Sequence, residues 1–277
     1  MSTKILNDKL GMKDLKVGDV LPGGNKVFKT KILGYDDFGN QLFEEENITV
    51  LPGALFTVEK LFKLTNDITD ATKERALDVS LGINTQISNS RPAEEFIVLF
   101  GVGTGGATDV VGSIKPTYYT DSQLAGLFPI RCVPVNTPLA DKYYVHKTQN
   151  IGGTNYECYY CKAFDSTPTL SVLRHMADGS DGPELTREDL DSKTNSMVDT
   201  FVSMTIKIDK TDAREWFELN GNVEAARINA LGLYTAWYDS VTQQYRNVRL
   251  FSELHFQNEI LHLSKSLTLV YRIYLAS

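Results

Sequence analysis

Apolar and polar residues alternate most regularly in the last third of the chain. Apolar residues recur at nearly every second position in residues 201–209, 248–256 and 267–275, which is the period of a β-strand with one buried face. In the middle run the residues that share the apolar face are Val248, Leu250, Leu254 and Phe256. The pattern predicts that the chain ends in long amphipathic strands that are tied into a sheet.

Shorter β-type runs occur in the middle of the chain. Residues 95–100 and 128–135 are rich in β-branched and aromatic side chains. Residues 143–147 are expected to pair with residues 156–164 across a glycine-containing turn at residues 151–155. These runs predict further antiparallel strands, one pair of them joined as a hairpin.

Helical spacing is limited to a few short segments. Residues 52–64 carry apolar side chains every three to four positions, and Pro52 suits a first helical turn. A second helix is expected at residues 69–81, with Gly82 as its stop. A third is expected at residues 211–219, with Thr211 as a possible cap.

The first fifty residues mix charges with glycine and aspartate turns, for example at residues 35–40. We expect an arm with one or two hairpins that gains order against another subunit. The predicted division is an N-terminal arm with short helices at residues 1–90 and a β-rich body at residues 91–277. The predicted fold is α+β and mainly β: antiparallel sheets in a sandwich or barrel-like body, a few short helices and an extended N-terminal segment.

Composition and charge narrow the classes of function. The chain has 28 basic and 35 acidic residues, so its net charge of −7 has the wrong sign for neutralising duplex phosphates, and we expect no sequence-specific binding of nucleic acid. Three cysteines are too few for a disulfide framework and fit assembly in a reducing cytoplasm. No window approaches the roughly 18 apolar residues of a membrane helix, and no apolar stretch follows the first charges, so neither a membrane partner nor a signal peptide is expected.

One segment imitates a nucleotide-binding motif. Residues 101–106 read Gly-Val-Gly-Thr-Gly-Gly directly after a predicted strand, but a dinucleotide site needs these glycines to open a helix. Gly112 and Pro116 leave no room for that helix. We therefore expect no cofactor, and we interpret Gly103 and Gly105 as a glycine turn or interface loop in which another backbone comes close.

Other apparent motifs have ordinary explanations. Asp37-Phe38-Gly39 copies a kinase triplet without the rest of the kinase motifs, so it is expected to be a turn. Cys158 and Cys161 have the spacing of half a zinc site, but an offset of three places them on opposite strand faces, which favours structural cysteines. The acidic segment Asp178–Asp191 is expected to be an exposed loop, and weak calcium binding stays open as an alternative.

Catalytic chemistry has no local signature in the sequence. The four histidines lie in separate segments and none accompanies a nucleophile motif. We therefore predict no catalytic and no metal-binding residues. A centre assembled only in space is the alternative that the sequence leaves open.

Aromatic residues on β-type segments are the remaining unusual feature. The chain has 13 Tyr and 13 Phe, and several tyrosines are adjacent, so that one of each pair can face solvent or a partner. The interface candidates are Phe251, Tyr274, Gly103, Gly105, Tyr118 and Tyr144. For Phe251 the alternative is that the helix at residues 52–64 covers its strand face, and for the tyrosines it is simple β-strand preference.

The second half of the chain also resembles a known class of proteins. The resemblance rests, in order, on Gly101–Gly106, Pro116 with Tyr118, Leu127–Arg131, Lys142–Tyr144, Asp212–Phe217, Ala226–Leu233, Asn247–Ser252 and Tyr271–Leu275. Over residues 95–275 the sequence resembles virion structural proteins of long-tailed bacteriophages. The first 90 residues do not contribute to it.

This resemblance implies a non-enzymatic virion protein, present in many copies in the neck, collar or head-to-tail connector region. A tail or baseplate part and a capsid accessory or decoration protein are less favoured positions. The implied partners are further copies, forming a ring or tube, and other virion proteins, with assembly in the host cytoplasm. The competing hypotheses are a hydrolase whose site combines the acidic loop with one histidine, and a glycan-binding β module with tyrosines as its platform.

Overall fold

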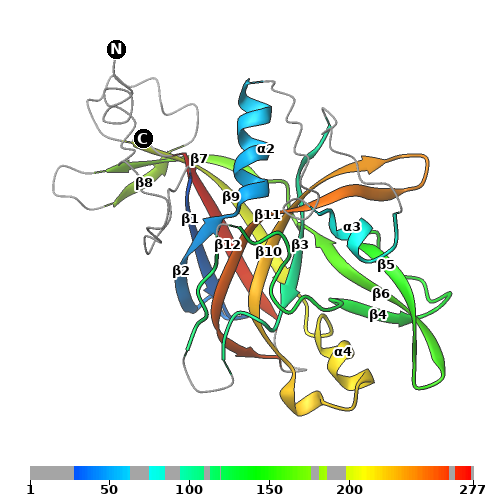
Figure 1. Ribbon diagram of the computed structural model, residues 1–277. Helices are drawn as coiled ribbons and strands as arrows, with labels where there is room; N and C mark the ends of the chain where they lie inside the picture. Colours follow the sequence, from blue (N-terminus) through cyan, green and yellow to red (C-terminus); the bar gives the residue numbers. More distant parts are fainter. Residues whose placement is uncertain are drawn as a thin grey trace.

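The computed structural model describes residues 28–62, 75–84, 94–108, 113–118, 120–175, 181–185, 198–261 and 266–275, and the structural statements below concern these residues. They form a mainly β protein of two antiparallel sheets with a few short helices (Figure 1), which confirms the predicted fold class. The strands are β1 (Phe28–Tyr35), β2 (Gln41–Thr49), β3 (Phe96–Gly103), β4 (Arg131–Pro134), β5 (Tyr143–Ile151), β6 (Thr154–Ala163), β7 (Thr169–His175), β8 (Asp181–Leu185), β9 (Val198–Ile208), β10 (Arg227–Asp239), β11 (Gln244–Ile260) and β12 (Leu267–Leu275). The helices are α2 (Leu51–Phe62), α3 (Leu77–Ser80) and α4 (Arg214–Leu219), and Val223–Ala225 forms a 3₁₀ turn.

Strand β2 joins the two sheets. In the first sheet the order is β2, β1, β12, β9, β7, β8, and in the second it is β4, β6, β3, β10, β11, with β5 on β6 as well. Most of β2 pairs with β1, but its last residues, Ile48 and Thr49, pair with Glu253 and Ser252 of β11. The strands therefore form one continuous antiparallel path that bends at β2.

The hydrophobic core lies between the two sheets. The first sheet contributes residues such as Ile206 and Tyr271, and the second contributes residues such as Phe100 and Leu231. The alternate positions that were predicted to face the core are buried or half-buried from Val202 to Ile208 on β9 and from Leu267 to Ile273 on β12. Burial of one strand face is what produces this period in the sequence, so this part of the prediction is confirmed.

Strand β11 differs from its predicted form because both of its faces are buried. All residues from Asn247 to Phe256 are buried, including the supposed outer face. Phe251 packs edge-on against Phe56 of α2, with ring centroids 6.2 Å apart. Gly53 lets the helix come this close, because a Cβ there would lie 2.0 Å from the Phe251 carbonyl oxygen. Phe251 is thus a core residue under α2 and not an exposed interface residue. This agrees with the alternative that the helix at residues 52–64 covers its strand face.

Replacing Phe251 with serine should lower the free energy of unfolding by about 3 kcal/mol, because the change removes a buried ring and leaves a cavity beneath α2. Urea denaturation monitored by fluorescence measures this loss. Phe38→Ser is the matched control, since Phe38 is 83% exposed and its loss should change stability by less than about 0.5 kcal/mol. Equal stability of Phe251→Ser and wild type would show that α2 does not cover this strand.

The boundary expected at residue 90 does not separate the described strands. β1 and β2 form the predicted hairpin, closed by a turn in which Gly39 has a φ of +81°. However, this hairpin is inserted between β12 and β11, which come from the end of the chain. A strand pair with one apolar face is stabilised by adding it to an existing core, so residues 28–49 are part of the body. Residues 1–27 lie outside the described residues, and the expected order–disorder behaviour of the arm stays a prediction.

The helices agree with their predictions only in part. α2 lies where the helix at residues 52–64 was predicted. Of the helix predicted at residues 69–81, only Leu77–Ser80 is helical among the described residues (α3), Arg75 and Ala76 are not, and residues 69–74 lie outside the described residues. α4 begins at Arg214, and no side chain caps it, so Thr211 is not its cap. The predicted acidic loop contains strand β8, which pairs with β7. Among the described helices none is long and apolar enough to span a membrane.

Candidate functional site

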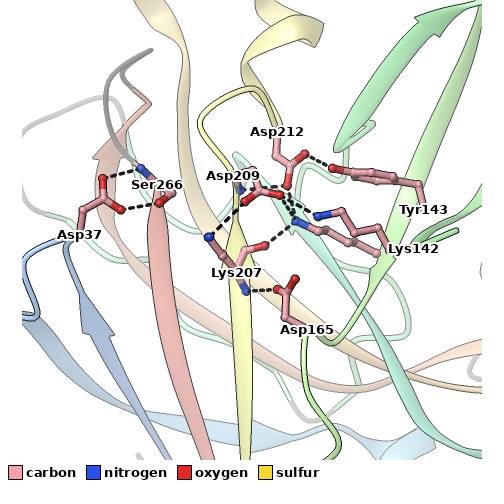
Figure 2. Close-up of polar contacts among 9 residues, drawn as sticks. Asp37, Lys142, Tyr143, Asp165, Lys207, Asp209, Asp212 and Ser266 are labelled. Atoms are coloured by element: carbon pink, nitrogen blue, oxygen red, sulfur yellow. Dashed lines mark hydrogen bonds and ion pairs between the residues drawn. The ribbon is translucent and has the colours of Figure 1, made fainter. Parts of the chain in front are cut away.

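The most concentrated group of charges lies where β6 of the second sheet approaches the end of β9 in the first. We call Lys142, Tyr143, Lys162, Asp209 and Asp212 the Lys162 cluster. Figure 2 shows Asp209 and Asp212 directed towards Lys142 and Tyr143. These side chains come from the start of β5 and the residue before it, from β6, and from the segment after β9; the last is far from β5 and β6 in the sequence.

Lys162 is completely buried and uses all of its hydrogen-bonding capacity. Its Nζ lies 2.6 Å from Asp212 Oδ2, 3.0 Å from Asp209 Oδ2 and 2.7 Å from the carbonyl oxygen of Lys207. An ammonium group has three protons to donate, so each one has a partner. A buried charge of this kind is tolerated only when it is paired and fully hydrogen-bonded.

The two aspartates hold the other members of the cluster. Tyr143 donates its hydroxyl proton to Asp212 Oδ1 at 2.7 Å, and burial together with the negative charge of Asp212 raises the pKa of Tyr143. Lys142 donates to Asp209 Oδ2 at 2.9 Å. Burial would raise the pKa of Asp209, but the hydrogen bonds from Lys142 and Lys162 outweigh it and lower this pKa to about 2. Near neutral pH the tyrosine therefore keeps its proton and Asp209 is ionised.

These charge states make the Lys162 cluster a structural link. Asp209 is a poor general base because its pKa lies far below neutral, and a general acid or base works best when its pKa is near the working pH. The cluster instead connects β6 to β9, between which no backbone pairing occurs in the described residues. A second bond at the same place joins the backbone N–H of Lys207 to Asp165, which follows β6 (Figure 2). Side chains thus close the gap between the two sheets.

Next to the cluster, the turn between β1 and β2 is fastened to Ser266, the residue that directly precedes β12. Asp37 accepts hydrogen bonds from the backbone N–H and the hydroxyl of Ser266, and these bonds lower the pKa of Asp37 (Figure 2). Asp36 accepts hydrogen bonds from the backbone of Phe38 and Asn40 within the same turn. Asp37-Phe38-Gly39 is therefore a turn, as predicted. A surface depression of about 470 Å³ separates it from Asp209 and Lys210.

The glycine segment allows close contact between two stretches of this chain. Thr104 and Gly105 donate backbone hydrogen bonds to Gly126 and Ala125 at 3.1 and 3.0 Å. A Cβ on Gly103 would lie 2.2 Å from the Ala125 carbonyl oxygen, and one on Gly105 would lie 2.5 Å from the Ala125 carbonyl carbon. The glycines are thus needed for backbone approach, but the approaching backbone belongs to the same chain. The glycines do not open a helix in the described residues that directly follow them, because Ala107 forms a β-bridge with Ile114.

A pair of buried titratable groups lies beside the glycine segment. Glu253 Oε1 accepts a hydrogen bond from the backbone of Ala125 at 2.7 Å and lies 2.9 Å from Nε2 of His255. The other ring nitrogen of His255 lies 2.9 Å from the carbonyl oxygen of Lys115. Burial would lower the pKa of His255, but these two acceptors outweigh it and raise the pKa, so the ring favours its charged form. The pair fastens Lys115 and Ala125 onto β11 and lines a depression of about 430 Å³.

The remaining interface candidates lie in different surroundings. Tyr118 is 54% exposed at the depression just described. Tyr144 is half-buried and packs edge-to-face against Tyr245, with ring centroids 4.7 Å apart. The backbone of Tyr274 pairs with Phe201 and Lys29, and its side chain lies outside the described residues. The six candidates therefore do not form one patch.

Only part of the predicted acidic segment lies among the described residues. Residues 181–185 are strand β8, and the rest of Asp178–Asp191 lies outside the described residues. Pairing of β7 with β8 sets His175 opposite Asp181. In the described part of the chain no three His, Cys, Asp or Glu side chains are grouped so that they could hold a metal ion. The calcium hypothesis stays untested.

Comparison with known proteins provides no family for this chain. No protein-family model matches the sequence, no curated protein matches it, and no solved structure matches the fold.

Proposed function

We propose that the protein is a non-enzymatic structural subunit of a long-tailed bacteriophage virion, which assembles in many copies with itself and with neighbouring virion proteins. The neck or head-to-tail connector region is the proposed position. The sequence resemblance over residues 95–275 suggests the viral class. The structural observation that carries the assembly proposal is a group of aromatic side chains at one end of the second sheet.

This group consists of Tyr144, Tyr238 and Tyr245, which we call the tyrosine cluster. The ring of Tyr245 contacts Tyr144 edge-on and lies 5.2 Å from the ring of Tyr238. Burial raises the pKa values of Tyr144 and Tyr245, so both rings keep their hydroxyl protons at neutral pH. Such pairs hold large amphipathic surfaces in fixed positions.

The tyrosine cluster continues into an exposed hairpin tip. Tyr238 is 46% exposed, and Val241 at the turn between β10 and β11 is 90% exposed. This hairpin projects from the body next to α3 (Figure 1). Rigid tyrosines beside an exposed aliphatic residue have the composition of a protein–protein contact, in which aromatic residues supply much of the binding energy.

The buried charges are consistent with a structural role. Lys162, Asp212, Glu253 and His255 are engaged in bonds between segments of the fold. Each of them bonds to partners within the chain, and Asp212, Glu253 and His255 also line surface depressions. The bonds that join distant segments support a structural role for these charges.

Light scattering coupled to size-exclusion chromatography tests the assembly. We expect the wild-type protein to form species whose masses are multiples of 30.9 kDa, with rings or tubes visible by negative-stain electron microscopy. The double variant Tyr238→Ser, Val241→Ser should weaken self-association at least tenfold while its melting temperature stays near that of the wild type, because both side chains are solvent-exposed. A wild-type protein that stays monomeric over the whole concentration range would overturn the proposal.

Phe38→Ser provides the matched control for this experiment. Phe38 is also a highly exposed apolar residue at a hairpin turn, but it lies between β1 and β2. We expect this variant to assemble normally. Loss of assembly in Phe38→Ser, with normal assembly of the double variant, would move the contact away from the tyrosine cluster.

A further inference from the structure

Two of the three cysteines meet across the strands β4 and β6. β4 and β6 are antiparallel and lie side by side in Figure 1, and Cys132 and Cys158 occupy directly opposite positions on them. Their sulfur atoms are 2.7 Å apart and both side chains are buried. Directly opposite residues on antiparallel strands bring their Cβ atoms to about 4.5–5.5 Å, close to the separation that a disulfide spans. Only a small movement is needed to join the two sulfurs.

The surroundings assign different roles to the two sulfurs. Contact with the Cys132 thiol lowers the pKa of Cys158, and the ammonium group of Lys147, whose residue pairs with Cys158 from β5, acts in the same direction. The same contact and burial raise the pKa of Cys132. Since the thiolate is the reactive form of cysteine, Cys158 is the sulfur that reacts first and Cys132 is the one that resolves the product.

The short strand β4 provides access to this buried pair. It has four residues and pairs with β6 alone among the described strands. Short edge segments with few backbone hydrogen bonds open at low cost in free energy. A small oxidant can therefore reach the sulfurs when β4 separates briefly from β6.

We propose that Cys132 and Cys158 are an oxidation site that forms a reversible intrachain disulfide with hydrogen peroxide or a related small peroxide. The Cys158 thiolate attacks one peroxide oxygen, so that an S–O bond forms, the O–O bond breaks, and the departing hydroxide takes up a proton as water. The Cys132 sulfur then attacks the Cys158 sulfur, forming the S–S bond, releasing its own proton and expelling the second oxygen as water. The two cysteines together lose two electrons, and the peroxide gains them.

The disulfide would fix the edge of the second sheet. It joins residues 26 positions apart and so encloses β5 and the first half of β6, up to Cys158, in a covalent loop. Closing a loop of this length restricts the unfolded chain. This inference goes beyond the proposed function and holds whether or not the protein assembles.

Cys161 is a built-in control on the same strand. It is completely buried among apolar residues that include Leu99 and Tyr234, and burial raises the pKa of its thiol. It is three residues from Cys158 and therefore on the other strand face. We expect it to stay reduced under conditions that oxidise the pair.

Thiol counting by mass spectrometry on the full-length protein tests the proposal. The protein is purified with a reductant, desalted, treated with hydrogen peroxide, unfolded and alkylated. The expected product has lost two hydrogen atoms, carries alkyl label on Cys161 only, and yields a proteolytic peptide in which Cys132 is linked to Cys158. Its melting temperature should rise by about 5–10 °C and return to the original value with dithiothreitol.

Three single-cysteine variants show which two cysteines form the disulfide. Cys161→Ala should show the same peroxide-dependent rise, whereas Cys132→Ala and Cys158→Ala should show none when each is compared with its own reduced form. Three alkylated cysteines in the treated wild type would overturn the proposal, as would a link that includes Cys161 or oxidation of Cys158 to a sulfinic acid without a link. The wild-type mass measurement stands even if a variant fails to fold.

Discussion

Replacing Lys162 with methionine should lower the free energy of unfolding by about 3–5 kcal/mol. The change keeps a long apolar stem but removes the charge that pairs with Asp212 and Asp209, at 2.6 and 3.0 Å. Asp212 is completely buried and would keep only its bonds from Tyr143 and the Asp209 backbone. Calorimetric and urea unfolding of the purified variant measure the loss.

Lys142→Met is the control for this variant, because it also removes a lysine beside Asp209 but one that is not buried. Lys142 contacts the same carboxylate, but about a third of its side chain is exposed, so its removal should cost no more than about 1 kcal/mol. The pKa of Asp209 is lowered from 3.8 to about 2 in the folded protein, so its contribution is present above pH 4 and is lost as the pH falls towards 2. The difference between wild type and Lys162→Met should shrink over that interval. Equal losses for the two lysine variants would show that burial of Lys162 does not matter.

Introducing aspartate at Ile273 should prevent folding or cost at least about 4 kcal/mol. Ile273 is buried in the core between the sheets, where β12 lies next to β9, and the new carboxylate would have no cation beside it within that cluster of apolar residues. Circular dichroism and the soluble fraction after expression report the outcome.

Thr268→Asp is the control on the same strand. Thr268 lies on the other face of β12 and is partly exposed at a depression that includes Lys207. Its aspartate variant should melt within a few degrees of the wild type. A soluble Ile273→Asp protein with normal melting would show that this face of β12 is not core.

The sequence predicted the strands that have one buried face. β9 and β12 each alternate because only one side packs into the core, and this leaves a period of two that can be recognised without a structure. The β5–β6 hairpin was also predictable, because Gly152 and Gly153 occupy its turn with positive φ values of 59° and 88°. Local patterns of this kind were sufficient for the fold class.

Strand β11 shows why the second layer was not predictable. Arg249, Glu253 and His255 alternate with apolar residues, a pattern that normally marks a solvent-facing side. In the structure they are buried, because their partners arrive from distant segments: Glu95 lies 3.9 Å from Arg249, and Ala125 bonds to Glu253. Charge pairing over such sequence separations leaves no local periodic signal.

The Lys162 cluster was missed for a related reason. Lys162 stands alone within the apolar strand end Cys161–Phe164, and a single lysine there has no partner nearby in the sequence. Asp212 precedes α4, where an acidic residue usually indicates a helix cap. Only the approach of β6 to β9 reveals that the two side chains form one group.

The insertion of the β1–β2 hairpin between β11 and β12 determines when this protein can fold. On the ribosome β1 emerges before its partner β12, which is translated more than 230 residues later. Until then β1 and β2 have only each other, and an isolated hairpin is marginally stable in water. Pairing of segments this distant carries a large loop-closure cost and slows folding. The two sheets should therefore be completed only after β12 has left the ribosome, in one cooperative step that adds β12 to β1.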